Sequence, residues 1–137
     1  EKGLIINLSS ISSFYPLPFL AVYSASKAYV DWLSRALDYE YRSKGIVFQT
    51  LLPSYISTKP TSFTKPGYII PDTCTFVNSA LSTVGTARRT TGYWTHGLQW
   101  WWCEHLPENL WNLFSWMLLK MLDNGKLQFD KQEKKHS

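Results

Sequence analysis

An α/β fold with a parallel sheet is the architecture that the sequence predicts. The runs 4–9 and 46–52 place apolar side chains on both faces of a strand, as the buried strands of parallel sheets do. Between them, residues 20–44 repeat apolar side chains at the spacing of a helix. A second helical pattern follows at 72–85.

The helix expected over 20–44 has a defined end and an apolar stripe. Arg42 and Lys44, followed by Gly45, are typical of a helix C-terminus. Asp31 and Asp38 lie off the stripe, which consists of Val22, Ala25, Tyr29, Val30, Leu33, Ala36 and Leu37. An amphipathic helix turns such a stripe towards a core.

An irregular loop is expected over 53–71, because Pro60, Pro66 and Pro71 interrupt it. Asp72 suits the N-cap of the helix 72–85. The buried face expected for that helix consists of Phe76, Val77, Ala80, Leu81 and Val84.

Composition excludes several functions. The length of 137 residues fits one domain or part of one, and the hydrophobic fraction of 45% supplies a core. The net charge of +4 comes from dispersed basic residues, so no nucleic-acid-binding stripe is predicted. Two cysteines make no disulfide framework, and the contiguous run Cys103-Glu104-His105 lacks metal-ligand spacing.

Three side chains stand at a spacing that suits proton transfer. Tyr23 and Lys27 are four residues apart on the expected helix, so they lie on one face, and Ser10 ends the first strand thirteen residues before Tyr23. An ammonium favours the phenolate form of a neighbouring tyrosine, and a serine hydroxyl can hold a substrate oxygen. Proton exchange with a carbonyl oxygen accompanies hydride transfer with a nicotinamide cofactor.

The tyrosine–lysine pair alone is a weak signal. Tyr55-Ile-Ser-Thr-Lys59 repeats the spacing in a loop, where the residue thirteen positions earlier is Arg42 rather than serine. The competing interpretation is a tyrosine that covers a core edge beside a solvated lysine. Ser10 and the strand before it favour the chemical interpretation.

Four stretches within 3–58 resemble the central and later part of a short-chain dehydrogenase/reductase. They are Gly3-Leu-Ile-Ile-Asn-Leu-Ser-Ser10, Tyr23-Ser-Ala-Ser-Lys-Ala-Tyr-Val-Asp31, Glu40-Tyr-Arg-Ser-Lys-Gly45 and Leu52-Pro-Ser-Tyr-Ile-Ser-Thr58. The chain is most similar to the hydroxysteroid dehydrogenase branch that includes the very-long-chain 3-oxoacyl-CoA reductases (17β-hydroxysteroid dehydrogenase type 12). Arg89-Thr-Thr-Gly-Tyr-Trp-Thr-His96 is similar to that branch and to its inactive relatives, in which the catalytic tyrosine tends to be replaced.

This resemblance implies roles for individual residues. Ser10 would orient the substrate carbonyl, and Tyr23, which is intact here, would donate or accept the proton. Lys27 would bind the nicotinamide ribose of NADP(H) or NAD(H) and favour ionisation of the tyrosine. Pro53, Ile56 and Thr58 would lie beside the nicotinamide carboxamide, although Ser54 replaces the glycine that many members have after that proline. The loop 53–71 would then be a lid over an apolar substrate, and a plain surface connection is the alternative.

The expected fold is the C-terminal part of a Rossmann-like doubly wound parallel sheet. The chain opens within a strand and contains no Gly-x-Gly-x-x-Gly turn, so we expect a C-terminal part of a longer protein, or a truncated product. Residues 1–90 are then the later half of a catalytic domain, without the adenosine and pyrophosphate sites. On its own such a chain is not expected to catalyse the reaction.

An aromatic, helical tail is expected over 91–137. Pro107 and Glu108 suit a helix start, and the apolar face over 107–122 fits either a helix lying in one membrane leaflet or a helix packed on the protein. Lys134 and Lys135 match the dilysine retrieval pattern of endoplasmic reticulum membrane proteins, which predicts that location. A homodimer through the helix 20–44 is a further expected contact.

Two functions are therefore expected to compete. The leading one is a reductase that acts on the ketone of a lipid, a 3-oxoacyl-CoA or a steroid, with NADPH or NADH. The alternative is a truncated or pseudoenzyme product that serves as a non-catalytic binding or dimerisation module.

Overall fold

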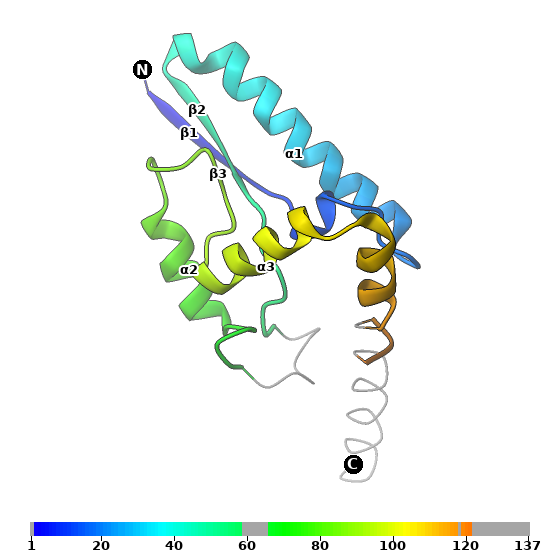
Figure 1. Cartoon of the computed structure of the whole chain (residues 1–137). Coiled ribbons are helices and arrows are strands. Elements are labelled where there is room, and N and C mark those ends of the chain that lie inside the picture. The colour runs from blue at the N-terminus through cyan, green and yellow to red at the C-terminus, as the bar shows by residue number, and fades with distance from the viewer. Residues whose placement is uncertain (1, 59–65, 118, 122–137) are drawn as a thin grey trace, which may run out of the picture.

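The computed structural model describes residues 2–58, 66–117 and 119–121 (Figure 1). Strand β1 (Gly3–Leu8) leads through a 3-10 turn, η1 (Ile11–Ser13), into helix α1 (Ala21–Tyr41) and a second 3-10 turn, η2 (Arg42–Lys44). Strand β2 (Ile46–Leu51), helix α2 (Thr73–Ser82), strand β3 (Arg89–Thr90) and helix α3 (Trp94–His105) follow. A further helix covers 108–117.

A parallel sheet joins the three strands of the described chain in the order β1-β2-β3. β1 and β2 pair in register from Gly3 with Ile46 to Leu8 with Leu51, which confirms the predicted parallel pair. Both strands end one residue earlier than expected. The two-residue strand β3 was not predicted, because so short a segment carries no period-2 pattern.

The parallel pairing brings two chain segments together at one edge of the sheet. Leu8 and Leu51 end their strands side by side, so the residues after them leave the sheet together. The N–H of Ser9 donates to the carbonyl oxygen of Leu51 at 2.8 Å, and the N–H of Ile11 donates to that of Pro53 at 3.0 Å. Ser10 therefore lies next to the loop that follows β2.

Helix α1 follows the predicted course but buries the opposite face. Its α-helical part ends at Tyr41, and the 3-10 turn continues to Gly45, whose φ of 78° closes the helix as expected. The predicted apolar stripe is largely exposed, with Val22 at 85% and Tyr29 at 66%. The buried residues are polar instead: Ser24, Asp31, Ser34 and Asp38.

Partners from distant segments explain this polar face. Asp31 accepts two hydrogen bonds from Arg89, at 3.1 and 2.8 Å. Asp38 accepts bonds from Arg42, from Arg88 and from the N–H of Phe48. Buried charges are tolerated when they are paired and hydrogen-bonded, as these two aspartates are.

Arg89 joins three segments around the edge of the sheet. Its guanidinium donates hydrogen bonds to Asp31 on α1. The same group also lies 4.7 Å from the ring centroid of Phe14 and 5.1 Å from that of Trp100. Phe14 follows η1 and Trp100 belongs to α3, and the two rings stack at 5.5 Å. A cation over aromatic faces is stabilised by the ring quadrupoles.

Helix α2 lies across the sheet from α1 (Figure 1) and is shorter than expected. Asp72 is its N-cap and accepts from the N–H of Thr75 at 3.0 Å, which confirms that prediction. The helix ends at Ser82 rather than at residue 85. Phe76 and Ala80 are buried, whereas Val77 and Leu81 are exposed, so the predicted buried face was too wide.

The region 53–71 is irregular wherever the structure describes it, apart from a bridge between Ser57 and Asp72. Pro60 and Lys59 lie outside the described residues. Helix α3 lies within the helical tail expected over 91–137, although the sequence set no bounds for it, and the helix expected after Pro107 is present. Trp111 from that helix packs with Leu17 and Cys103 in a core cluster. In the part of the chain that the structure describes, no helix has the length and apolar character needed to cross a membrane.

Asp38 gives a test of the polar interface between α1 and the sheet. Burial alone would raise the pKa of Asp38, but hydrogen bonds from Arg88, Arg42 and the N–H of Phe48 lower it to about 2. The Asp38→Asn variant is expected to lose about 2 kcal/mol of unfolding free energy at neutral pH, because two guanidinium groups lose the negative charge of their partner and one of its two acceptor oxygens. Urea unfolding of the natural protein that contains this chain measures the loss.

The pH dependence follows from the lowered pKa of Asp38. The carboxyl group has its ordinary pKa of 3.8 in the unfolded chain, and above that pH its contribution to stability is complete. The contribution is lost as the pH falls towards about 2, the pKa in the folded protein. Asp38→Asn should therefore differ less from wild type near pH 2 than at pH 7. Glu40→Gln, an equal change of charge at an exposed position of the same helix, is the control. Equal losses in the two variants would contradict the assigned role.

Candidate active site

Ser10 is held at the carboxyl end of β1 by its own turn. It is the N-cap of η1, has an extended backbone with φ −162°, and is only 9% exposed. Its Oγ accepts a hydrogen bond from the N–H of Ser12 at 3.2 Å. The capping bond fixes the hydroxyl at the edge of the sheet, which is where the sequence placed it.

Tyr23 and Lys27 lie on the first turns of α1, on the same side of the helix. The Nζ atom of Lys27 is 5.6 Å from the centroid of the Tyr23 ring. The same Nζ donates to the carbonyl oxygen of Leu8 at 3.1 Å, and Ser9 Oγ donates to the carbonyl oxygen of Lys27 at 2.7 Å. These two bonds tie the Tyr23–Lys27 turn to the strand that ends beside Ser10.

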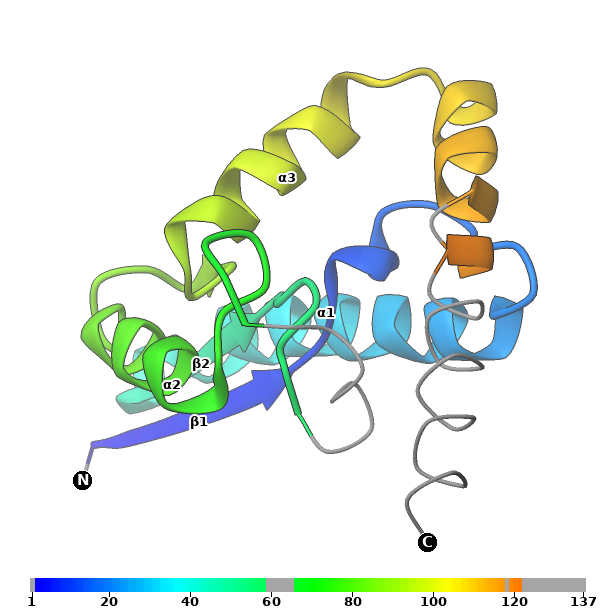
Figure 2. The same cartoon turned by 90° about the horizontal axis from the view of Figure 1, so that it is seen from below.

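Ser10 and Tyr23 open into one cavity of about 710 Å³. Helix α3 and the helix 108–117 lie on the same side of the sheet edge as η1 (Figure 2), and all three contribute to its wall. Most of the lining is apolar, from Leu17, Leu20, Ile69, Ile70, Trp102, Leu106, Trp111 and Phe114. Lys27 does not line the cavity. It contacts the site indirectly, because its ammonium lies near the Tyr23 ring and donates to the carbonyl oxygen of Leu8.

The predicted cofactor loop is only partly in this cavity. Pro53 is buried and its carbonyl oxygen binds the N–H of Ile11, whereas Ile56 is half-buried and Thr58 is exposed. Ser54 and Tyr55, which belong to the lid expected over 53–71 and were given no cofactor role, line the cavity instead. Burial raises the pKa of the Tyr55 phenol, and the nearby charge of Tyr23 adds to the rise. Tyr55 thus stands in the same wall as Tyr23.

Three residues of α3 were missed by sequence reasoning. His96 is fully buried and binds the backbone of Ser54 and Tyr55, and Gln99 binds the side chain of Ser54. Thr95 Oγ1 donates to the carbonyl oxygen of Tyr68 at 2.9 Å. The sequence did not indicate where this helix begins and ends, because Gly97 lowers helix propensity and α3 begins without a side-chain cap.

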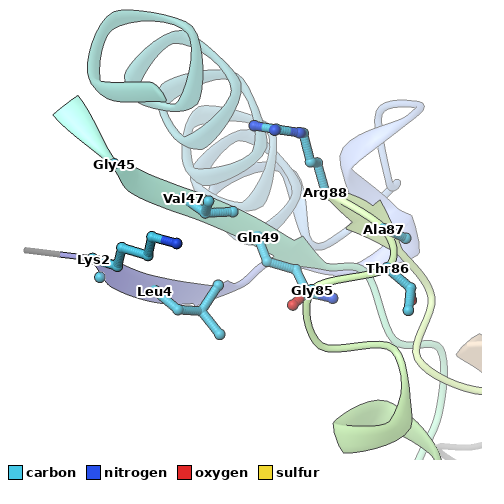
Figure 3. A pocket seen from close by; sticks show the side chains of 10 residues that line it. Lys2, Leu4, Gly45, Val47, Gln49, Gly85, Thr86, Ala87 and Arg88 are labelled. Atoms are coloured by element: carbon cyan, nitrogen blue, oxygen red, sulfur yellow. The ribbon is translucent and has the colours of Figure 1, made fainter. Parts of the chain in front are cut away.

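A second pocket, of about 570 Å³, lies at the other end of the strands (Figure 3). Lys2, Gly45, Gln49 and Arg88 are among the residues around it. Gln49 donates from Nε2 to Thr83, and its buried Oε1 accepts no hydrogen bond from the residues that the structure describes. The sequence-predicted site residues lie away from this pocket, at the opposite edge of the sheet.

The described residues hold no cluster of three or more His, Cys, Asp or Glu side chains that suits a metal ion. Burial raises the pKa of the Cys103 thiol to about 11, so the thiol stays protonated at neutral pH. His105 Nδ1 lies 2.7 Å from the carbonyl oxygen of Trp101, four residues back along α3. Within the run 103–105, Cys103 packs in the core cluster and His105 makes a contact within its own helix.

The fold and the site together define an α/β protein whose polar groups gather at the carboxyl edge of a parallel sheet, where proteins of this architecture bind ligands. A model of the short chain dehydrogenase family matches residues 1–67. The inactive hydroxysteroid dehydrogenase-like protein 1 of Homo sapiens is 45% identical over 115 residues, which cover 81% of this chain and 35% of that protein. The very-long-chain 3-oxoacyl-CoA reductase of Macaca fascicularis is 45% identical over 124 residues, or 90% of this chain and 38% of the reductase.

A solved structure is similar as well. The crystal structure of the bulky-bulky ketone specific alcohol dehydrogenase from Comamonas testosteroni matches 91% of this chain and 42% of its own, with a TM-score of 0.55 and 25% identity. The chain belongs to the short-chain dehydrogenase family. It spans little more than a third of the length of the curated relatives it matches.

Proposed function

We propose that the protein containing this chain is an oxidoreductase that reduces the ketone of a lipid with NADPH or NADH. One observation carries the proposal: Ser10 and Tyr23 line the same apolar cavity, and Lys27 lies beside Tyr23. Membership of the short-chain dehydrogenase family supports the oxidoreductase class. The substrate, the cofactor and the roles of the three residues are our assignment.

The groups at the sheet edge suit the nicotinamide end of such a cofactor. A lysine ammonium has three donors, and Lys27 directs one of them to Leu8, so others remain for ribose hydroxyls. The loop Pro53–Thr58 would lie against the carboxamide. The sequence has no Gly-x-Gly-x-x-Gly turn, so this chain supplies no pyrophosphate site of that kind.

The chain's own residues would position the ketone and supply a proton. When bound, the cofactor supplies the hydride that forms the new C–H bond. Ser10 Oγ would donate to the carbonyl oxygen and hold it near Tyr23. As the C=O π bond breaks, the proton of the Tyr23 hydroxyl would pass to that oxygen, and the Lys27 ammonium would stabilise the phenolate left behind.

The cavity wall favours a lipid ketone over a polar substrate. Its lining is mainly aliphatic and aromatic, and its volume of about 710 Å³ is in the range of pockets for drug-sized ligands. One relative is named a very-long-chain 3-oxoacyl-CoA reductase and another a hydroxysteroid dehydrogenase-like protein. We therefore propose a 3-oxoacyl-CoA or a steroid ketone as the substrate class.

A non-catalytic binding or dimerisation module is the second candidate. Several relatives carry the word inactive in their names. In addition, α1 exposes a row of large apolar side chains, including Val22, Tyr29, Trp32 and Tyr39, which a second copy could cover. Turnover by the natural protein separates the two candidates, because a module of this kind would bind without consuming cofactor.

Removal of the Tyr23 hydroxyl tests the proposed chemistry. In the full natural protein, supplied with NADPH and a long-chain 3-oxoacyl-CoA, Tyr23→Phe should lower kcat by at least about a hundredfold, the usual contribution of a general acid. NADPH affinity should change little, because only one hydroxyl is lost. Tyr39→Phe, at an exposed position of the same helix, should turn over at the wild-type rate. Equal rates for Tyr23→Phe and wild type would eliminate Tyr23 as the proton donor.

We also propose that the helix 108–117 contacts the membrane of the endoplasmic reticulum. The helix buries Trp111, while Leu110, Leu113 and Met117 are about half exposed or more. An amphipathic helix with such an outer face can lie in one leaflet. The predicted dilysine signal, Lys134 and Lys135, lies outside the described residues.

Vesicle flotation measures this contact. The natural protein should float with vesicles of phosphatidylcholine and phosphatidylserine, and the double variant Leu113→Glu, Met117→Glu should float several-fold less, because two charges would enter the apolar interface. Val22→Glu, at an exposed apolar position on α1, is the control and should float as wild type does. Undiminished flotation of the double variant would rule out this helix as the membrane contact.

A further inference from the structure

His96 makes two hydrogen bonds to consecutive residues of the loop after β2. The N–H of Ser54 donates to its Nδ1 at 3.3 Å, and its Nε2 lies 3.2 Å from the carbonyl oxygen of Tyr55. Since Nδ1 accepts a hydrogen bond, the proton of the neutral ring must be on Nε2, which donates to Tyr55. One imidazole therefore holds both a backbone donor and a backbone acceptor of this loop.

The packing around His96 keeps its ring in one orientation. The side chain is fully buried, with the ring of Tyr93 edge-on at 5.3 Å and that of Phe76 at 5.7 Å. Burial lowers the pKa of His96, which favours the neutral ring that these bonds require. Gly92 lets the chain enter α3 this close to α2: its φ is 72°, and an added Cβ would stand 3.0 Å from the Cβ of Ala80.

Neighbouring residues of α3 hold the other side of the same loop region. Gln99 accepts from Ser54 Oγ and donates from Nε2 to the carbonyl oxygen of Ile69 at 3.4 Å. Thr95 binds Tyr68. Helix α3 thus contacts the chain on both sides of residues 59–65, while Gln99, Trp102 and Cys103 of the same helix line the cavity.

We propose that His96 is a positioning residue for cofactor binding, which sets the Pro53–Thr58 loop at the carboxyl edge of the sheet through the backbone of Ser54 and Tyr55. This role rests on the proposed function, since it assigns that loop to the nicotinamide. His96 lies behind the loop and is not part of the cavity wall, so it acts through the loop and touches neither substrate nor cofactor. Ser54 and Tyr55 do line the cavity, so a shift of their backbone changes the site directly.

Three substitutions at position 96 separate the two bonds. His96→Leu keeps an apolar side chain in the buried site and removes both bonds, which leaves the Ser54 N–H and the Tyr55 carbonyl oxygen unpaired. His96→Asn can keep an acceptor near the Nδ1 position, and His96→Gln can keep a donor near the Nε2 position. NADPH binding, followed by fluorescence with the full natural protein, should weaken about tenfold in His96→Leu and by less in the other two.

Steady-state kinetics distinguish positioning from general damage. The KM for NADPH should rise with the loss of affinity, and the KM for the lipid should rise as well, because Ser54 and Tyr55 also line the lipid cavity. The kcat should change less, because Ser10, Tyr23 and Lys27 make no hydrogen bond to His96. His105→Leu, which removes an imidazole from the exposed end of the same helix, should bind NADPH as wild type does. The nitrogen resonances of wild-type His96 should show Nε2 protonated and Nδ1 unprotonated near neutral pH, a result that needs no variant to fold.

These measurements test the role of His96 separately from the proposed reductase function. Unchanged NADPH affinity in a folded His96→Leu protein, or a proton on Nδ1 in the wild type, would overturn the role of His96 and leave the reductase proposal standing. If the His96→Leu protein fails to fold, the NADPH affinities of His96→Asn and His96→Gln and the tautomer of His96 in the wild type still test this role. A wild-type protein that binds no nicotinamide cofactor would instead contradict the proposed function itself.

Discussion

The parallel pairing of β1 with β2 is the constraint on which the whole site depends. It ends both strands at one edge of the sheet, so Ser10 and the Pro53–Thr58 loop emerge side by side. The hydrogen bond from Lys27 Nζ to the carbonyl oxygen of Leu8 then links α1 to the same edge, and Tyr23 and Ser10 line the same cavity. A one-residue slip of the pairing would turn the side chains of β1 to the other face and shift Ser10 away from that loop.

Polar contacts hold this arrangement together with apolar packing. The face of α1 that meets the sheet carries Asp31 and Asp38, and arginines around β3 satisfy both of them. Arg89 also contacts the rings of Phe14 and Trp100, which links the segment after Ser10 to α3. Because buried charges are costly when unpaired, these bonds also determine which packing of the helices is acceptable. The apolar outer faces of α1 and of the helix 108–117 remain available for other contacts.

The sequence was informative where structure is local and uninformative where it depends on distant partners. The placement of Ser10, Tyr23 and Lys27 could be predicted because a strand end and two helix positions four residues apart fix it within a short segment. The face that α1 buries was predicted wrongly, since Arg88 and Arg89, more than forty residues beyond the helix, make the polar face the inner one. A helical tail was expected over 91–137, but the bounds of α3 could not be set because the aromatic run around Trp100 shows no amphipathic period. Without those bounds, His96 could not be assigned a role. Ser54 and Tyr55 lie in the lid expected over 53–71, but which residues of that loop line the cavity depends on its packing with α3.

The most direct test of the account is a crystal structure of the natural protein with the oxidised cofactor and a bound lipid ketone. In that complex, Tyr23 Oη and Ser10 Oγ should both lie within about 3 Å of the ketone oxygen, the range of a hydrogen bond. The Lys27 ammonium should contact the ribose, and the lipid chain should occupy the apolar cavity. A ketone oxygen bound away from both hydroxyls, or a nicotinamide ring on the far side of the sheet, would contradict the account.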